Sequence, residues 1–145
     1  MEGITSHVEG LLRIARNVIG NSYSPYSRFK VASVVRTSDG RVFHGVNVEN
    51  ASYGLTVCAE RVAIFTAVAN GARSVEEILV ATETEEPVPP CGACLQVLSE
   101  FASSETRIYM ASLSSGKVVV KKLSELMPYR FTKKELEQKA KSRNG

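Results

Sequence analysis

The chain has 145 residues, of which 43% are hydrophobic and 23% charged, a balance typical of one soluble globular domain. No apolar run approaches the ~20 residues that span a bilayer, which argues against a membrane protein. The net charge of +3 lies in residues 131–145, which hold five basic and two acidic residues, so residues 1–130 are balanced. A polynucleotide-binding domain carries its basic stripe on the folded face. The distribution therefore argues against a nucleic-acid partner and predicts a domain over residues 1–131 with a solvated basic tail over 132–145.

The first half of the chain predicts one helix, a hairpin and two loops. Residues 3–20 place apolar side chains at helical spacing, which indicates an amphipathic helix. Residues 21–27 have the composition of a loop. Two strands, over 29–35 and 41–46, flank a Ser-Asp-Gly turn and predict a hairpin. The segment 47–54 is polar and rich in turn formers, which favours a loop that carries functional groups.

The second half alternates helices with strands. Helices are predicted over residues 58–70 and 91–101, and strands over 78–82, 107–111 and 117–121. The link between the last two strands is too short for a parallel crossover, so these strands should be antiparallel. The alternation predicts an α/β sandwich with parallel central strands. A Thr-x-x-Glu capping box in the tail predicts a short surface helix there.

All three cysteines lie in two short motifs, Cys-Ala-Glu-Arg and Pro-Cys-Gly-Ala-Cys, about thirty residues apart. A Cys-x-Glu followed by Pro-Cys-x-x-Cys matches the zinc-deaminase arrangement of three ligands and one carboxylate that is not a ligand. Three protein ligands leave the fourth position of Zn²⁺ open, which suits a catalytic site. We therefore expect one Zn²⁺ per chain on Cys58, Cys91 and Cys94. An odd cysteine count with this pattern also predicts reduced thiols and a cytoplasmic location.

Glu60 is the predicted general acid and base. Two residues beyond Cys58, it can take a proton from water, pass it to a pyrimidine ring nitrogen and later protonate the departing ammonia. If both motifs open helices, the helix N-termini stabilise thiolate charge, and Arg61 can donate hydrogen bonds to the sulfur of Cys58 or Cys91. The alternative is a structural three-cysteine zinc site with Glu60 as a helix N-terminal carboxylate. His7 and His44 are the conceivable fourth ligands, but neither has ligand-like spacing.

Five motifs, in order from about residue 10 to residue 131, resemble those of the small homotetrameric cytidine deaminases. The metal motifs alone indicate the wider zinc-deaminase superfamily, whereas Asn-x-Glu-Asn-Ala-x-Tyr at residues 47–53 is more specific to free-nucleoside enzymes. The other two are Ser-Pro-Tyr-Ser-x-Phe-x-Val and Leu-Met-Pro-x-x-Phe. The resemblance implies a three-layer α/β/α fold with a five-stranded mixed sheet. It also implies hydrolytic deamination of cytidine and 2′-deoxycytidine, with release of ammonia, in pyrimidine salvage.

The resemblance assigns substrate-binding roles residue by residue. Asn47 and Glu49 would hydrogen-bond the ribose 3′-hydroxyl, and Phe29 would stack on the base. The backbone N–H of Ala59 would hold the pyrimidine O2, and the carbonyl of Pro89 would receive the amino group. An Asn–Glu pair offers both donors and acceptors to a sugar hydroxyl, which agrees with these assignments.

The resemblance also implies a homo-oligomer, a tetramer with shared active sites. Phe131 would reach a neighbouring subunit's pocket, and Tyr53 would lie near a subunit boundary. Two positions depart from the family pattern, which usually has Gly at the position of Ala32 and Arg at that of Leu95. Neither departure touches the proposed metal ligands or Glu60.

Three other functions remain open at this stage. The nearest is a sister enzyme acting on a cytosine-containing antibiotic such as blasticidin S, but that family lacks the Asn-x-Glu-Asn-Ala-x-Tyr run. The basic tail motivates a second alternative, a polynucleotide editor or a nucleic-acid-binding module. The balanced charge of residues 1–130 argues against it. A non-catalytic zinc-bearing interaction protein is the last alternative.

Overall fold

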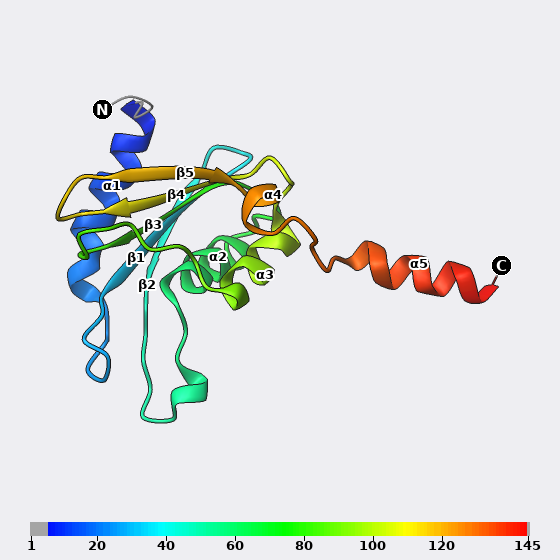
Figure 1. Cartoon of the computed structure of the whole chain (residues 1–145), viewed down its shortest axis with the longest axis horizontal. Helices are drawn as coiled ribbons and strands as arrows, with labels where there is room; N and C mark the ends of the chain where they lie inside the picture. The colour runs from blue at the N-terminus through cyan, green and yellow to red at the C-terminus, as the bar shows by residue number, and fades with distance from the viewer. Residues whose placement is uncertain (1–5, 145) are drawn as a thin grey trace.

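A five-stranded mixed sheet forms the middle layer of the molecule (Figure 1). The computed structural model describes residues 6–144 of the chain. The strand order is β2-β1-β3-β4-β5. The strands are β1 (Val31–Thr37), β2 (Val42–Val46), β3 (Val75–Thr82), β4 (Arg107–Ser112) and β5 (Val118–Lys122).

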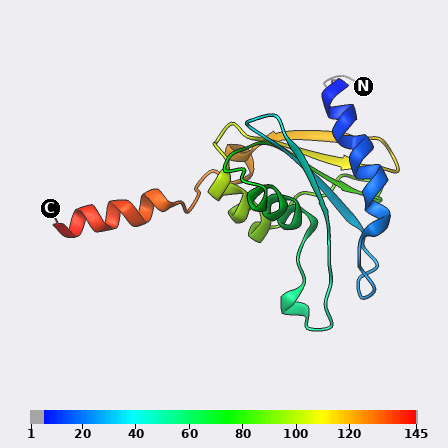
Figure 2. The same ribbon diagram turned by 180° about the vertical axis from the view of Figure 1, so that it is seen from behind.

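Helices cover both faces of the sheet, which gives the expected three layers (Figures 1 and 2). Helix α1 lies on one face, and α2 and α3 lie on the other. The short helix α4 follows β5, and α5 projects away from the body. The start of the first helix was predicted at residue 3, but residues 3–5 lie outside the described residues. The helices are α1 (Ser6–Val18), α2 (Ala59–Ala69), α3 (Gly92–Phe101), α4 (Leu123–Leu126) and α5 (Lys133–Asn144), with 3-10 turns η1 (Ile19–Asn21) and η2 (Tyr53–Leu55).

Strand pairing agrees with the predicted hairpins and corrects one detail. Strands β1 and β2 pair antiparallel, as do β4 and β5. Strands β3 and β4 are parallel, but β1 runs antiparallel to β3. The prediction of parallel central strands therefore holds only for β3 and β4. The reason is that the β1–β2 hairpin places β1 next to β3 and leaves β2, the strand that leads into α2, at the sheet edge.

Two hydrophobic clusters hold the three layers together. Side chains alternate along a strand, so β3 contributes to both clusters. Ile78 and Val80 face α2 and α3, whereas Leu79 and Ala81 face α1. All four are at most 2% exposed. Leu95 also belongs to the cluster beneath α2 and α3, so this departure from the family pattern is a core side chain. No helix among residues 6–144 is long and apolar enough to cross a membrane.

Helix α2 lies directly on β2 because Gly45 has no side chain. A Cβ atom at this position would be 2.5 Å from the Ala63 nitrogen and 2.8 Å from the Ala59 oxygen. Both alanines are fully buried. Contact between the backbones of helix and strand therefore fixes the first turn of α2, where the first metal motif lies.

The carboxylate of Glu77 is the centre of a polar cluster on the α1 face. Its oxygens lie 2.5 Å from His7 Nε2, 3.0 Å from Arg36 Nε, 2.6 Å from Arg107 Nη2 and 3.0 Å from the Tyr109 hydroxyl. Burial alone would raise the pKa of this carboxyl, but the hydrogen bonds from Arg107, Arg36 and Tyr109 hold it below its ordinary value. The cluster joins α1 to three neighbouring strands.

We expect Glu77→Gln to lower the free energy of unfolding at pH 7 by about 3 kcal/mol, because the guanidinium groups of Arg36 and Arg107 lose their counter-charge. Urea denaturation measures this difference. Glu76→Gln is the matched control, since the side chain of Glu76 is 45% exposed and pairs with Arg36 at 3.5 Å. Its effect should stay below about 0.5 kcal/mol.

The pH dependence of this difference has a definite sign. A folded-state pKa below the ordinary 4.5 means that the stabilisation from ionised Glu77 is complete above pH 4.5. It is lost as the pH falls through the lowered folded-state pKa, so wild-type and Glu77→Gln proteins should converge in acid. A difference that stays constant with pH would contradict an ionic origin.

We also expect Gly45→Ala to destabilise the fold by about 1–3 kcal/mol, because the new methyl group forces α2 away from β2. Thermal unfolding measures the change. Gly10→Ala in α1 is the control, since nothing lies within 4 Å of its Cβ position. There the exchange should stabilise the helix by roughly 0.8 kcal/mol. Equal effects at both sites would refute close backbone packing at Gly45.

Candidate active site

The N-termini of α2 and α3 bring the three cysteines together. Cys58 is the N-cap of α2, Cys91 is the N-cap of α3, and Cys94 lies in the first turn of α3. The Cys91 and Cys94 sulfurs are 3.3 Å apart, and those of Cys58 and Cys91 are 3.9 Å apart. All three sulfurs lie within 4.8 Å of one another. Two motifs thirty residues apart therefore form a single cluster of thiols.

This cluster has the chemistry and size of a zinc site. Zn²⁺ binds thiolates at about 2.3 Å, so tetrahedral ligands would have sulfurs about 3.8 Å apart, close to the spacing found here. Within residues 6–144, the cluster contains no histidine. His7 instead contacts Glu77 through its ring nitrogen, and His44 lies on the exposed side of β2. The donors present thus fit a three-ligand site rather than a closed four-ligand site.

Hydrogen bonds and helix ends favour the thiolate form of Cys58. A hydrogen bond from Cys94 outweighs burial and, with bonds from Arg61 and Cys91, lowers the pKa of Cys58 to about 5. The pKa of Cys94 rises because its proton is held by the neighbouring Cys58 sulfur and because the thiol is buried. Arg61 Nη2 donates to Cys58 Sγ at 3.5 Å, and Cys94 N donates to Cys91 Sγ at 3.5 Å. The positive ends of both helix dipoles add to this stabilisation.

Glu60 is a buried carboxyl group beside the thiols. It lies in the first turn of α2 and is 5% exposed. Burial, together with the negative charge of Cys58, raises its pKa to about 7. A carboxyl group with this pKa can both accept and release a proton near neutral pH, which general acid–base catalysis requires.

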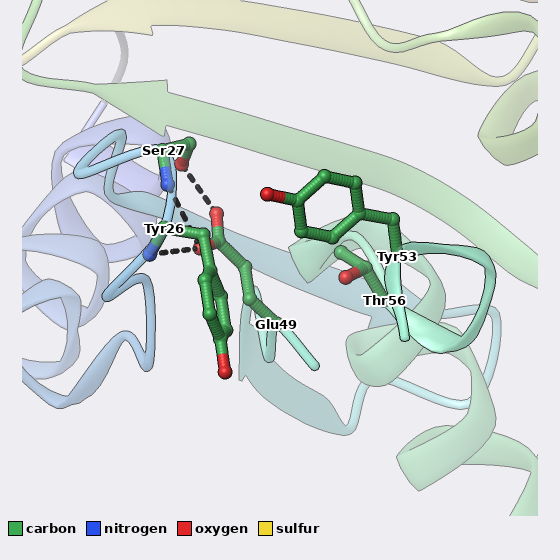
Figure 3. Close-up of a pocket in the computed structure, with 5 residues that line it drawn as sticks. All are labelled: Tyr26, Ser27, Glu49, Tyr53 and Thr56. Carbon is green, nitrogen blue, oxygen red and sulfur yellow. Dashed lines mark hydrogen bonds between the residues drawn. The ribbon is translucent and has the colours of Figure 1, made fainter. Parts of the chain in front are cut away.

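A pocket of about 360 Å³ lies between two loops, one after η1 and one before α2 (Figure 3). It is lined by Tyr26, Ser27, Glu49, Tyr53 and Thr56. The rings of Tyr26 and Tyr53 meet edge to face, with centroids 5.9 Å apart. Thr56 precedes Cys58 by only two residues, so the same segment passes from the pocket wall to the metal motif.

Short backbone bridges hold the two loops side by side. Val48 bridges Tyr23 in parallel and Val57 in antiparallel fashion. The Tyr23 N–H donates to the Asn47 oxygen at 3.0 Å, and the Glu49 N–H donates to the Tyr23 oxygen at 2.8 Å. Asn47 and Glu49 flank Val48 in this extended segment, so their side chains project from the same side.

Most hydrogen-bonding positions of Glu49 are already occupied. Its Oε1 accepts from the backbone N–H groups of Tyr26 at 3.0 Å and Ser27 at 3.1 Å, and its Oε2 accepts from the Ser27 hydroxyl (Figure 3). The Ser27 hydroxyl does most to lower the pKa of this carboxyl. Because a carboxylate has about four acceptor positions, one position on Oε2 remains free.

The side chain of Asn47 is committed in a similar way. Its Oδ1 accepts from the Val31 N–H at 3.0 Å and from Ser22 Oγ at 2.5 Å. Its Nδ2 donates to the Phe29 oxygen at 2.7 Å. One N–H of the amide therefore has no hydrogen-bond partner among residues 6–144, although Asn47 is only 7% exposed.

Four residues with contacts at this site were given no role by the sequence: Ser22, Tyr26, Ser27 and Thr56. Ser27 lies within the Ser-Pro-Tyr-Ser motif, so the motif was the available signal. Ser22 lies just outside that motif, and the only sequence signal for a role was its position in a loop rich in hydroxyl groups.

The remaining predicted residues occupy different surroundings. Phe29 is 39% exposed and follows Arg28, whose φ of 61° turns the loop sharply. Ala59 opens α2, where backbone N–H groups have no intrahelical acceptor. Tyr53 lines the pocket and is 75% exposed. Phe131 does not line this pocket; its side chain is 58% exposed, and its oxygen accepts from Gln96 Nε2 at 2.8 Å.

Comparison with known proteins agrees with this geometry. The sequence model of the cytidine and deoxycytidylate deaminase zinc-binding region matches residues 5–111, which include all three cysteines and Glu60. A cytidine deaminase of Halalkalibacterium halodurans is 44% identical over 87% of this chain and 95% of its own length. That of Sporosarcina psychrophila is 40% identical over 89% of this chain and 94% of its own length.

Solved structures show the same fold. The crystal structure of cytidine deaminase from Burkholderia pseudomallei superposes with a TM-score of 0.81 at 43% identity, over 88% of this chain and all of the other. Cytidine deaminase from Mycobacterium leprae superposes with a TM-score of 0.74 at 34% identity, over 87% of this chain and all of the other. On the family match, the full-length relatives and the shared fold, this chain belongs to the zinc-binding cytidine deaminase family.

Proposed function

We propose that the protein catalyses the hydrolytic deamination of cytidine and 2′-deoxycytidine to uridine and 2′-deoxyuridine, with release of ammonia, in pyrimidine salvage. The observation that carries this proposal is the cluster of three cysteine thiols beside a buried glutamate whose pKa is about 7. The names of the relatives support the choice of substrate.

Cys58, Cys91 and Cys94 would hold one Zn²⁺ per chain. When bound, such an ion lowers the pKa of a coordinated water to near 7. Three thiolates give the site an excess of negative charge, which would oppose this effect. The helix N-termini and the hydrogen bond from Arg61 to Cys58 draw part of that charge away, so the residues around the cysteines preserve the acidity of the site.

Glu60 moves the protons. It accepts one proton from the attacking water and delivers it to N3 of the pyrimidine. It then takes the second proton from the hydroxyl group added at C4 and passes it to the amino group, which leaves as ammonia. Its pKa of about 7 suits both directions of transfer, since neither the acid nor the base form is scarce near neutral pH. Burial keeps the carboxyl away from bulk water, so proton exchange is directed to the substrate.

The two loops would recognise the nucleoside. Asn47 retains one N–H and Glu49 one acceptor position, and this combination fits a single hydroxyl group that both accepts and donates. The 3′-hydroxyl is common to ribose and deoxyribose, so the pair would accept both substrates. Phe29 would stack on the base, and the Ala59 N–H would hold the pyrimidine O2.

A homotetramer with shared active sites completes the proposal. Large apolar side chains remain exposed on the single chain, which favours burial against other subunits. Phe65 on α2 is 50% exposed, Leu55 beside the pocket is 66% exposed, and Phe131 is 58% exposed. Phe131 would enter the pocket of a neighbour, and Tyr53 would lie at the subunit boundary. The three free cysteines agree with a cytoplasmic location.

The first test is ammonia release from cytidine by the purified protein, with zinc measured on the same sample. Glu60→Gln should retain about one zinc per chain and the wild-type circular dichroism spectrum, because Glu60 is not a ligand. Its kcat should fall by at least roughly 10²-fold, since proton transfer loses its carrier. Glu100→Gln, on the exposed side of α3, is the matched control and should keep full activity.

Full activity of Glu60→Gln would refute the mechanism. Zinc without turnover of cytidine by the wild type would instead favour the antibiotic substrate or a non-catalytic zinc protein. Parallel assays with blasticidin S separate these two outcomes.

Sharing of active sites can be tested by mixing two inactive variants. Glu60→Gln lacks the proton carrier, and Phe131→Ala should lose most activity because it leaves the neighbouring pocket open. Co-expressed in equal amounts, the variants should recover about a quarter of wild-type activity, since some pockets then combine an intact Glu60 with an intact Phe131 from another chain. Sedimentation equilibrium should give four times the chain mass of 15.8 kDa. No recovery on mixing would refute sharing through Phe131.

A further inference from the structure

Ser22 lies where the first helical segment of the chain ends. It directly follows η1, and its own N–H donates to the Ile19 oxygen at 3.1 Å, which fixes its backbone. Its half-buried side chain reaches Asn47, with Ser22 Oγ 2.5 Å from Asn47 Oδ1. Ser24 Oγ, at 3.1 Å, is a second acceptor for the single Ser22 proton, but Asn47 Oδ1 is the nearer of the two. The Ser22 hydroxyl group thus connects the α1–η1 segment to the loop that carries Asn47 and Glu49.

The amide of Asn47 has one orientation in this structure. The Val31 N–H can only donate and the Phe29 oxygen can only accept, so Oδ1 must face Val31 and Nδ2 must face Phe29. An amide oxygen accepts two hydrogen bonds. Val31 supplies the first and Ser22 the second, so no acceptor position on Asn47 is left for a ligand.

The occupied oxygen gives the Asn47–Glu49 pair a fixed polarity. Asn47 can only donate through its remaining N–H, and Glu49 can only accept through its remaining position on Oε2. A sugar hydroxyl bound between them must donate its proton to Glu49 and accept from Asn47. Any other arrangement would leave one of these buried groups unsatisfied.

We propose that Ser22 is a positioning residue for sugar recognition: by filling the second acceptor position of Asn47 Oδ1, it makes Asn47 a pure donor and directs the sugar hydroxyl's proton to Glu49. The proposal rests on the proposed function, since it assumes that Asn47 and Glu49 bind the 3′-hydroxyl. Without the Ser22 hydroxyl, Oδ1 would compete with Glu49 for that proton or would hold a water molecule. Discrimination for the 3′-hydroxyl would then weaken.

The test compares Ser22→Ala with wild type on two substrates, cytidine and 3′-deoxycytidine. We expect kcat/KM for cytidine to fall roughly three- to tenfold, mainly through KM, because one hydrogen bond of the recognition network is lost. For 3′-deoxycytidine, which lacks the hydroxyl, kcat/KM should stay within twofold of wild type. A purely structural effect would lower kcat/KM for both nucleosides equally.

Three matched variants sharpen the result. Ser22→Thr keeps a hydroxyl group and should restore the wild-type ratio of the two substrates. Ser24→Ala removes the alternative acceptor of the Ser22 proton, so the preference for cytidine should be at least as strong as in the wild type. In an Asn47→Ala background, Ser22→Ala should have no further effect on the ratio, as expected for residues that act through each other.

The outcomes separate this proposal from the proposed function. A wild-type protein that discriminates against 3′-deoxycytidine, with Ser22→Ala discriminating equally well, would overturn the role of Ser22 alone. A wild type that uses both nucleosides equally would overturn sugar recognition by Asn47 and Glu49, and the role of Ser22 with it. A wild type that turns over neither nucleoside would overturn the proposed function itself.

Discussion

The meeting of two helix N-termini on one face of the sheet is the constraint on which the site depends. Cys58 and Cys91 cap these helices, and Cys94 lies in the first turn of the second. Each helix follows a strand: α2 follows β2 at the sheet edge, and α3 crosses between the parallel strands β3 and β4. Gly45 then lets α2 rest on its own strand with backbone contact. Thiolates, free N–H groups and dipoles of one sign therefore converge where an electrophilic metal is needed.

Two buried glutamates have pKa values shifted in opposite directions because their surroundings differ. Glu77 is enclosed by the guanidinium groups of Arg36 and Arg107 and by the Tyr109 hydroxyl, and its pKa is held low. Glu60 is also buried, and burial together with the negative charge of Cys58 raises its pKa to about 7. The same side chain is thus a permanent anion that joins α1 to the sheet in one place and a group able to exchange a proton near neutral pH in the other.

The two loops leave few hydrogen-bonding positions open on Asn47 and Glu49. Backbone and hydroxyl groups occupy most of the positions on Asn47 and Glu49, including both acceptor positions of the amide oxygen. Side chains whose hydrogen bonds are already made within the fold are held rigidly, so the few positions that stay free can bind only a matching group. The donor and acceptor that remain match one hydroxyl group. If this pair binds the nucleoside as proposed, its selectivity comes from the hydrogen bonds that the fold has already made.

The sequence by itself predicted that three cysteines meet with a glutamate beside them, and it predicted the course of the main helices and strands, because these depend on local spacing and periodicity. Only the tertiary structure decided that β1 lies between β2 and β3, that Glu77 has four polar partners, and that Ser22 occupies the second acceptor position of the Asn47 amide oxygen. His7 is 70 residues from Glu77, and Ser22 is 25 residues from Asn47. Contacts between residues so far apart in the chain leave no periodic pattern, and they form only when packing brings the layers together.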